Sequence, residues 1–148
     1  MAEVFQELAT LQVEFVEFVA YVTLNRPEAR NAMNAQMVAE LTQLFHSLRN
    51  NREIRAIVLS GSEGFFCAGG DIKEMRERGM PAGEDANNLD AMLRACNESP
   101  QIVIARVEGA ALGGGLGLVC VSDVAIASTT AKFGLTEVRL GVAPSFIS

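Results

Sequence analysis

The stretch Val107–Asp123, VEGAALGGGLGLVCVSD, places five glycines between Gly109 and Gly117 in an otherwise apolar run. Three interpretations are open: a buried packing segment, a membrane segment, and a loop whose backbone approaches a ligand closely. The apolar run from Gly109 to Val121 has thirteen residues, whereas a membrane-spanning helix needs about 20. The membrane interpretation is therefore excluded, and packing and ligand binding remain.

The composition favours one globular domain, which is expected to span residues 1–148. Apolar residues make up 49% and charged residues 20% of the chain, which is ordinary for a globular protein and too apolar for a disordered one. The net charge is −6 and the Lys and Arg residues form no cluster, so a nucleic-acid partner is not expected.

Cysteine and histidine usage indicates neither a disulfide framework nor a metal centre. Cys67, Cys96 and Cys120 are odd in number and lack CxxC spacing. The single histidine, His46, lies in a helical pattern, which argues against a multi-histidine metal site and against a Ser-His-Asp triad. The stretch Met1–Gln12 carries acidic residues where a signal peptide carries basic ones. These features predict a reducing, cytoplasmic setting.

Helix and strand patterns alternate along the chain, which predicts an α/β fold. Leu11–Leu24 alternates in polarity and predicts a β-hairpin with its turn near Glu17. Three short runs predict buried strands: 55–61, 102–107 and 123–128. Three segments predict helices: Asn34 (as the N-cap) to about Arg49, Asp71–Arg78 and Asp85–Ser99. The polar stretch Gly79–Asp85 is the expected mobile loop.

Two glycine-rich loops each follow a predicted strand, at the strand ends where α/β folds bind ligands. They are SEGFFCAGGD (62–71) and GGGLG (113–117). Their spacing fits neither the dinucleotide fingerprint nor a P-loop. If Leu116–Val121 is helical, the second loop places backbone N–H groups at a helix N-terminus, which favours negative charge. Two such donors aimed at one carbonyl oxygen form an oxyanion hole, and the alternative is that the glycines only permit close helix–strand packing.

Five motifs in the chain occur together in a characteristic order. They are VTLNRPEARNAMN (22–34), FFCAGGDIKEM (65–75), VEGAALGGGLGL (107–118), SDVAIAS (122–128) and AKFGLTEVRLGVAP (131–144). Together they resemble the crotonase superfamily of enoyl-CoA hydratases and isomerases, from about Leu11 to the end of the chain. The resemblance implies a crotonase-like ββα spiral core, of which this chain holds the N-terminal part. It also implies an enzyme that binds an acyl-CoA thioester and stabilises an enolate at the thioester carbonyl.

The resemblance assigns residues to the two loops and to the NRP segment. The implied oxyanion pair is the backbone N–H of Gly70, before the Asp of AGGD, and that of Gly114, the second glycine of GGG. The residues implied to line CoA are Ala29, Arg30, Ala68, Asp71, Ile72 and Lys73. The cations among them could neutralise phosphate charge locally. Because CoA arrives with the substrate, no separate cofactor and no metal are expected.

The implied catalytic carboxylate is Glu137, in FGLTEVRLG. Hydratases of this family carry two glutamates, and the position of the first is occupied here by Gly117. One carboxylate can support either hydration across the 2,3 double bond or proton transfer between C2 and C4. The motifs GGxxGL and LTEVRLGVAP most resemble hydratases of methylglutaconyl-type thioesters. Hydration therefore ranks first, and Δ3,Δ2-enoyl-CoA isomerisation is the alternative.

The resemblance further implies helices beyond Ser148, which complete the acyl pocket, the CoA site and a trimer or dimer of trimers. Their absence from this chain raises a function of another class, namely an inactive CoA-binding or assembly module. A scaffold without a ligand is a third class. It gives no reason for two glycine loops and an NRP segment in the family's order.

Overall fold

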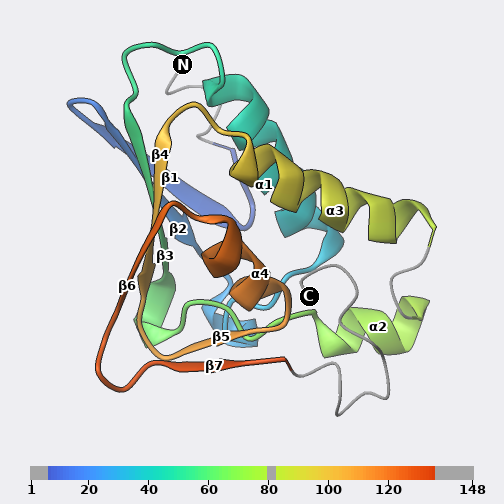
Figure 1. The fold of residues 1–148 in the computed structure, drawn as a ribbon. Coiled ribbons are helices and arrows are strands. Elements are labelled where there is room, and N and C mark those ends of the chain that lie inside the picture. The colour runs from blue at the N-terminus through green and yellow to red at the C-terminus, as the bar shows by residue number, and fades with distance from the viewer. Residues whose placement is uncertain (1–6, 80–82, 136–148) are drawn as a thin grey trace.

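The computed structural model describes residues 7–79 and 83–135 and opens with a β-hairpin (Figure 1). Strands β1 (Leu11–Val16) and β2 (Val19–Leu24) are antiparallel neighbours. The turn is tight because Glu17 adopts a left-handed backbone conformation with φ of 52°, although glycine or asparagine is the usual residue there. The predicted hairpin and its turn at Glu17 are confirmed.

The hairpin is the edge of a five-stranded sheet. Strands β3 (Ala56–Gly61), β4 (Ile102–Val107) and β6 (Val124–Ala127) follow β2 in parallel, and the spatial order is β1-β2-β3-β4-β6. Parallel neighbours require crossover connections, which the helices of the chain supply. The alternating α/β prediction is confirmed.

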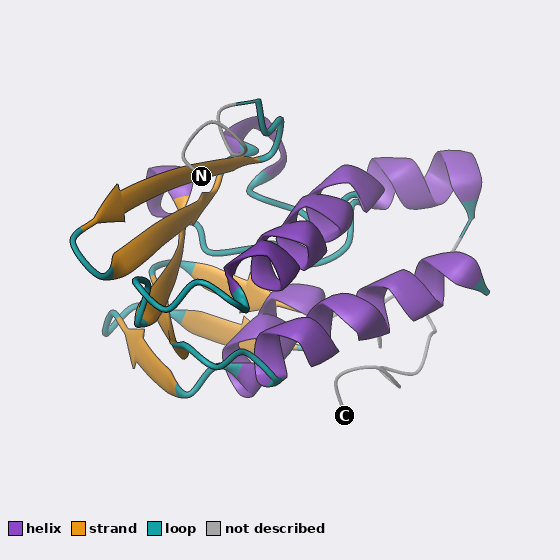
Figure 2. Ribbon diagram, turned by 90° about the horizontal axis from the view of Figure 1, so that it is seen from above, coloured by secondary structure: helices purple, strands orange, loops and turns teal. Residues whose placement is uncertain are grey.

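Helices α1 (Ala35–Leu48) and α3 (Glu84–Asn97) lie beside one another against one face of this sheet (Figures 1 and 2). The apolar residues at helical spacing in α1 are all buried: Met37, Leu41, Leu44, Phe45 and Leu48. The corresponding residues of α3 are Met92, Leu93 and Cys96, which are buried, and Leu89, which is half-buried against the core. Each large apolar side chain buried here contributes about 1.5–3 kcal/mol, so this helix–sheet layer is the main source of stability.

The opposite face of the sheet is open among the described residues, and this corrects the prediction of fully buried strands. In β4, Val103 and Ala105 face the helices and are buried, whereas Ile102 points away and is exposed. All four residues of β6 are exposed, Ile126 to 61%. The strands look buried in sequence because both faces carry apolar residues, but the described elements cover only one face of β4 and neither face of β6.

The sequence predicted Asn34 as an N-cap and Asp71 as the start of a helix. Asn34 caps α1, since its side chain accepts a hydrogen bond from the Met37 N–H at 2.9 Å. Asp71 caps α2 (Ile72–Arg78) in the same way, with the Glu74 N–H at 3.1 Å. Both predicted helix starts are confirmed.

A smaller sheet and a short helix complete the described fold. Strands β5 (Ala110–Leu112) and β7 (Lys132–Gly134) pair in parallel and cross the lower end of the large sheet in Figure 1. Between them, helix α4 (Gly114–Val121) packs beside α3. The sequence did not indicate β5 or β7, and α4 begins two residues before the predicted Leu116. Gly114, Gly115 and Gly117 are therefore helical.

Two 3₁₀ turns, η2 (Pro27–Ala29) and η3 (Ser62–Gly64), form connections near the glycine loops. His46 is exposed on α1. Within the described ranges, no helix has the length and apolarity to cross a membrane, and no cluster of His, Cys, Asp or Glu could hold a metal ion. Of the predicted loop Gly79–Asp85, residues 80–82 lie outside the described part of the chain, and α3 begins at Glu84.

Candidate active site

The two glycine loops are joined by their backbones at Cys67. This residue forms an isolated parallel bridge with Ala111 of β5. Its N–H donates to the Ala110 carbonyl at 3.0 Å, and its carbonyl accepts from the Leu112 N–H at 2.9 Å. The loop that ends in CAGGD therefore runs directly beside the strand that leads into GGG.

Tight packing at Cys67 explains one glycine of the second loop. A Cβ on Gly115 would lie 2.6 Å from the Cys67 Cβ and 2.9 Å from its Sγ, closer than nonbonded carbon atoms approach. Burial raises the pKa of the Cys67 thiol to about 11, so this thiol is neutral at physiological pH. For Gly115 the packing interpretation holds.

The neighbouring glycines serve other purposes. Gly113 is the N-cap residue of α4, has a φ of 51° and donates its N–H to the Gly134 carbonyl at 3.0 Å. Gly114 is the first residue of α4 and is buried. Its N–H belongs to the first turn of the helix, whose amides have no acceptor within the helix. No other described group accepts a hydrogen bond from this N–H.

Gly70, in the first loop, is held beside Met33. The Met33 N–H donates to the Gly69 carbonyl at 2.7 Å, and the Met33 carbonyl accepts from the Asp71 N–H at 3.0 Å. In a parallel bridge of this kind the residues on either side of Gly70 form the hydrogen bonds, so the Gly70 N–H points away from Met33. No hydrogen-bond acceptor for it lies in the described ranges.

Met33 also contacts the second loop, through its side chain. The Met33 Sδ lies 3.1 Å from the place that a Cβ on Gly114 would occupy. The same residue thus forms backbone hydrogen bonds around Gly70 and packs against Gly114. The structure brings the two predicted N–H donors to one place in the fold, from segments that are distant in sequence.

The two donors differ in exposure. Gly114 is buried, whereas Gly70 is exposed. Among the described residues, the Gly114 side of the site is therefore covered and the Gly70 side is not.

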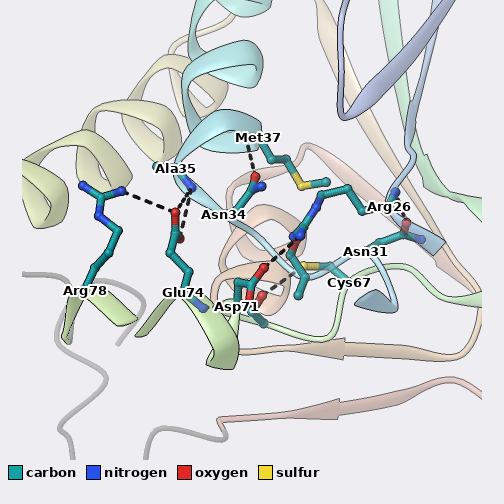
Figure 3. Close-up of polar contacts among 11 residues, drawn as sticks. Arg26, Asn31, Asn34, Ala35, Met37, Cys67, Asp71, Glu74 and Arg78 are labelled. Carbon is teal, nitrogen blue, oxygen red and sulfur yellow. Dashed lines mark hydrogen bonds and ion pairs between the residues drawn. The ribbon is translucent and has the colours of Figure 1, made fainter. Parts of the chain in front are cut away.

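An ion pair that the sequence did not indicate lies beside Gly70. The Arg26 guanidinium contacts the Asp71 carboxylate at 2.9 Å, and the two side chains are only 16% and 12% exposed (Figure 3). Burial favours the neutral acid, yet the hydrogen bond from the Glu74 N–H and the ion pair with Arg26 together lower the pKa of Asp71 below its ordinary value. Asp71 is therefore ionised and fixed at the start of α2.

Asn31, like Arg26, holds the segment around the first glycine loop and was not singled out by the sequence analysis. It is fully buried and its side-chain amide donates to the carbonyls of Ser62 at 3.1 Å and Phe65 at 2.7 Å. Its Oδ1 accepts from the Arg26 N–H at 2.7 Å. The signal that could have found both residues is the placement of polar groups directly after the buried end of β2, where a buried polar group needs partners.

The predicted CoA-lining residues fall into two groups. Ala29 ends η2 and Arg30 follows it, and the Arg30 carbonyl accepts from the Ala68 N–H at 3.1 Å, which joins these three residues. The exposed Arg30 guanidinium lies 5.6 Å from the Phe65 ring centroid.

The second group lies at the start of α2. Ile72 and Lys73 occupy its first turn, directly after Asp71, and both are exposed. The side chain of Asp71 itself is engaged by Arg26 and by the helix N-terminus.

Of the two positions considered for a catalytic carboxylate, the structure describes one. Glu137 lies outside the described residues. Gly117, where the family pattern has its first glutamate, is buried within α4 and donates its N–H to the Gly113 carbonyl at 3.0 Å. No side chain is present at this position to act as an acid or base.

Comparison with known proteins identifies the family of the chain. A family model described as Enoyl-CoA hydratase/isomerase matches residues 14–148. The chain therefore belongs to the enoyl-CoA hydratase/isomerase family. The resemblance to this family is confirmed, whereas no finding tests the methylglutaconyl-type subgroup.

Individual relatives carry names that agree with this family. A Rhizobium meliloti protein named "Probable enoyl-CoA hydratase" is 45% identical over 135 residues, which are 91% of this chain and 52% of that protein. The "Short-chain-enoyl-CoA hydratase" of Clostridium acetobutylicum is 39% identical over 95% of this chain and 54% of its own length. The chain spans about half the length of the curated relatives that it matches.

Solved structures confirm the crotonase-like α/β prediction. "Pseudomonas aeruginosa AtuE" superposes with a TM-score of 0.89 at 47% identity, over 93% of this chain and 55% of that one. An enoyl-CoA hydratase from Shewanella pealeana superposes with a TM-score of 0.93 at 34% identity, over 99% of this chain and 57% of that one.

Proposed function

We propose that the protein hydrates a 2-enoyl-CoA thioester, whose carbonyl oxygen accepts hydrogen bonds from the N–H groups of Gly70 and Gly114. The observation that carries this proposal is the meeting of the two loops at Met33, with both N–H groups unpaired within the described residues. Negative charge develops on the thioester oxygen when the enolate forms. Two backbone donors stabilise that charge, and losing one typically costs about 3–4 kcal/mol of transition-state stabilisation.

In the proposed reaction Glu137 is the acid and base. Its carboxylate takes a proton from water while the oxygen of that water adds to Cβ of the enoyl group. The electron pair of the 2,3 double bond moves to the thioester oxygen, and the proton then returns from Glu137 to Cα. One carboxylate is sufficient for this sequence, because the proton removed and the proton delivered can be the same.

The position of Gly117 favours a second candidate, Δ3,Δ2-enoyl-CoA isomerisation. Without a second carboxylate, Glu137 would carry a proton between C2 and C4, and a dienolate would form with its negative charge on the same thioester oxygen. The two candidates share the oxyanion pair and differ only in whether water attacks.

We also propose that Ala29, Arg30, Ala68, Asp71, Ile72 and Lys73 line the CoA moiety. The exposed cations Arg30 and Lys73 are suited to its phosphates. Backbone donors can stabilise an enolate without a metal or redox group, so the proposal includes CoA only as part of the substrate. A methylglutaconyl-type acyl chain, a homotrimer or dimer of trimers, and a cytoplasmic setting are further parts of the proposal. The three free cysteines support that setting, because disulfides are rare there.

Ultraviolet absorbance of a conjugated enoyl-CoA thioester tests the proposal. We expect absorbance to fall with the native protein, and Glu137→Gln to slow that fall by about 10²–10⁴-fold. Glu98→Gln is the matched control, since Glu98 is an exposed acid at the end of α3, paired with Arg49 at 3.8 Å. A gain of absorbance from a 3-enoyl-CoA, without loss from the conjugated one, would select the isomerase. Silence with both substrates would reject catalysis and favour the CoA-binding module.

A further inference from the structure

The Arg26 side chain forms two hydrogen bonds with different segments. One terminal nitrogen donates to the Ala32 carbonyl at 2.6 Å. The other donates to the Asp71 carboxylate at 2.9 Å, as Figure 3 shows. Ala32 directly precedes Met33, and Asp71 directly follows Gly70. The planar guanidinium thus contacts both segments of the Met33–Gly70 bridge, at the residue before Met33 and at the residue after Gly70.

The contact with Ala32 begins a chain of hydrogen-bonded peptide groups. The Ala32 carbonyl and the Met33 N–H belong to one peptide unit, and this N–H donates to the Gly69 carbonyl at 2.7 Å. The Gly69 carbonyl and the Gly70 N–H belong to the next unit. The described peptide bonds include no cis bond, so in each unit the N–H points opposite to the C=O. The chain therefore runs from the Arg26 cation through two peptide units and ends at the Gly70 N–H.

This arrangement has two physical consequences. First, the Met33 N–H fixes the plane of the Gly69–Gly70 peptide, which would otherwise turn easily because neither residue has a side chain. Second, a cation at the head of a hydrogen-bonded series polarises each member, so the terminal N–H becomes a stronger donor.

We propose that Arg26 is a positioning residue for the reaction: through Ala32 and Met33 it orients and polarises the Gly70 N–H toward the substrate carbonyl. The inference rests on the proposed function, because it needs a thioester oxygen at that N–H. Arg26 itself does not touch the substrate.

The test measures polarisation of the carbonyl as well as turnover. A 2-enoyl-CoA labelled with ¹³C at the thioester carbonyl is bound to the protein, and its C=O stretching frequency is read by infrared difference spectroscopy. With the native protein we expect the frequency to fall on binding. In Arg26→Met we expect it to return most of the way to the value in water, and kcat to fall about tenfold, less than when a whole donor is lost. KM should change much less than kcat.

Matched variants separate positioning from general damage. Arg26→Lys keeps the cation and one hydrogen bond to Ala32, so it should retain more of the frequency shift than Arg26→Met. This variant also preserves the test if Arg26→Met does not fold. Arg106→Met removes an exposed cation paired with Glu108 at 3.2 Å and should leave the shift unchanged. A thioether analogue of the substrate, which lacks the carbonyl, should bind the native protein and Arg26→Met alike.

The outcomes are distinguishable. If the native protein gives no frequency shift, the oxyanion pair itself is wrong and the role of Arg26 is rejected with it. If the native shift is present and a folded Arg26 variant keeps all of it, the proposed function stands and the role of Arg26 is rejected. Equal loss of affinity for the thioether analogue and the thioester in Arg26→Met would show a purely structural role, which also overturns the inference.

Discussion

The two glycine loops present one backbone N–H each, but they are held in different ways. The second loop is buried, and packing fixes it: Gly115 lies against Cys67 and Gly114 against Met33. The first loop is exposed at Gly70 and is fixed by polar contacts, with Arg26 joined to Asp71. A donor can therefore be positioned by van der Waals contact or by hydrogen bonds, and each mode has its own sensitivity to mutation.

The donors also gain their strength from different sources. The Gly114 N–H stands at the start of α4, where the helix dipole favours negative charge. The Gly70 N–H follows two peptide units that begin at Arg26. The contrast predicts that substitutions in the second loop do harm mainly by steric clash. Substitutions near the first loop are expected to do harm mainly by removing a charge.

The largest effect is expected for Gly115→Ala. The new Cβ would lie 2.6 Å from the Cys67 Cβ and 3.0 Å from its carbonyl oxygen, and the backbone cannot move aside cheaply. We expect the free energy of unfolding to fall by about 3 kcal/mol, the upper end of overpacking costs. Urea unfolding followed by circular dichroism measures it. A loss below about 0.5 kcal/mol would show that the loop adapts and that packing does not fix it.

An intermediate effect is expected for Asp71→Asn, and it depends on pH. Asn keeps the helix cap but not the charge, so at neutral pH we expect a loss of about 1.5 kcal/mol, typical of a charged hydrogen bond. Because the folded-state pKa of Asp71 lies below its ordinary value of 3.8, its stabilisation is complete above that value. It is lost as the pH falls through the lower, folded-state pKa.

The stability difference between the native protein and Asp71→Asn should therefore shrink as the medium is acidified below pH about 4. Unfolding at a series of pH values measures this difference. A difference that stays constant down to pH about 2 would mean that the ion pair contributes nothing to folding. Glu40 also has a lowered pKa, but it is unchanged in both proteins and cancels in the comparison.

The smallest effect is expected for Gly70→Ala. Among the described residues its Cβ would meet only the Met75 side chain, with the methyl at 2.4 Å, and the end of a methionine can turn away. The loss of stability should stay below about 1 kcal/mol, and activity should persist because the N–H is retained. Thermal unfolding and the absorbance assay check both. A loss as large as that of Gly115→Ala would remove the distinction between the loops.

The parts of the fold with local signals could be predicted from the sequence. The alternation of Leu11–Leu24 predicted the hairpin, the N-cap Asn34 predicted one helix start, and the helical pattern from Asp71 predicted another, because each signal lies within a few residues of its effect. The strands β5 and β7 were missed because each has three residues and pairs over a distance of about twenty positions in the chain. Their residues have no alternation long enough to recognise.

The candidate site, too, could be predicted from the sequence only in part. Gly70 and Gly114 could be assigned from motifs, but the roles of Arg26 and Asn31 could not. The ion-pair partner of Arg26 lies 45 positions away, and the carbonyls that accept from the Asn31 amide lie 31 and 34 positions away. Nor could the sequence distinguish Gly115, which provides space, from Gly114, which provides an N–H. That difference depends on which side chain of another segment packs against each glycine in the folded protein.

The buried thiol of Cys67 makes the opening of this site measurable. With its pKa raised to about 11 and its sulfur held against Gly115, this thiol reacts with an alkylating reagent only when the two loops separate. Cys120 is exposed and gives the rate for an accessible thiol. The ratio of the two alkylation rates therefore reports how often the loops come apart, without any substrate present.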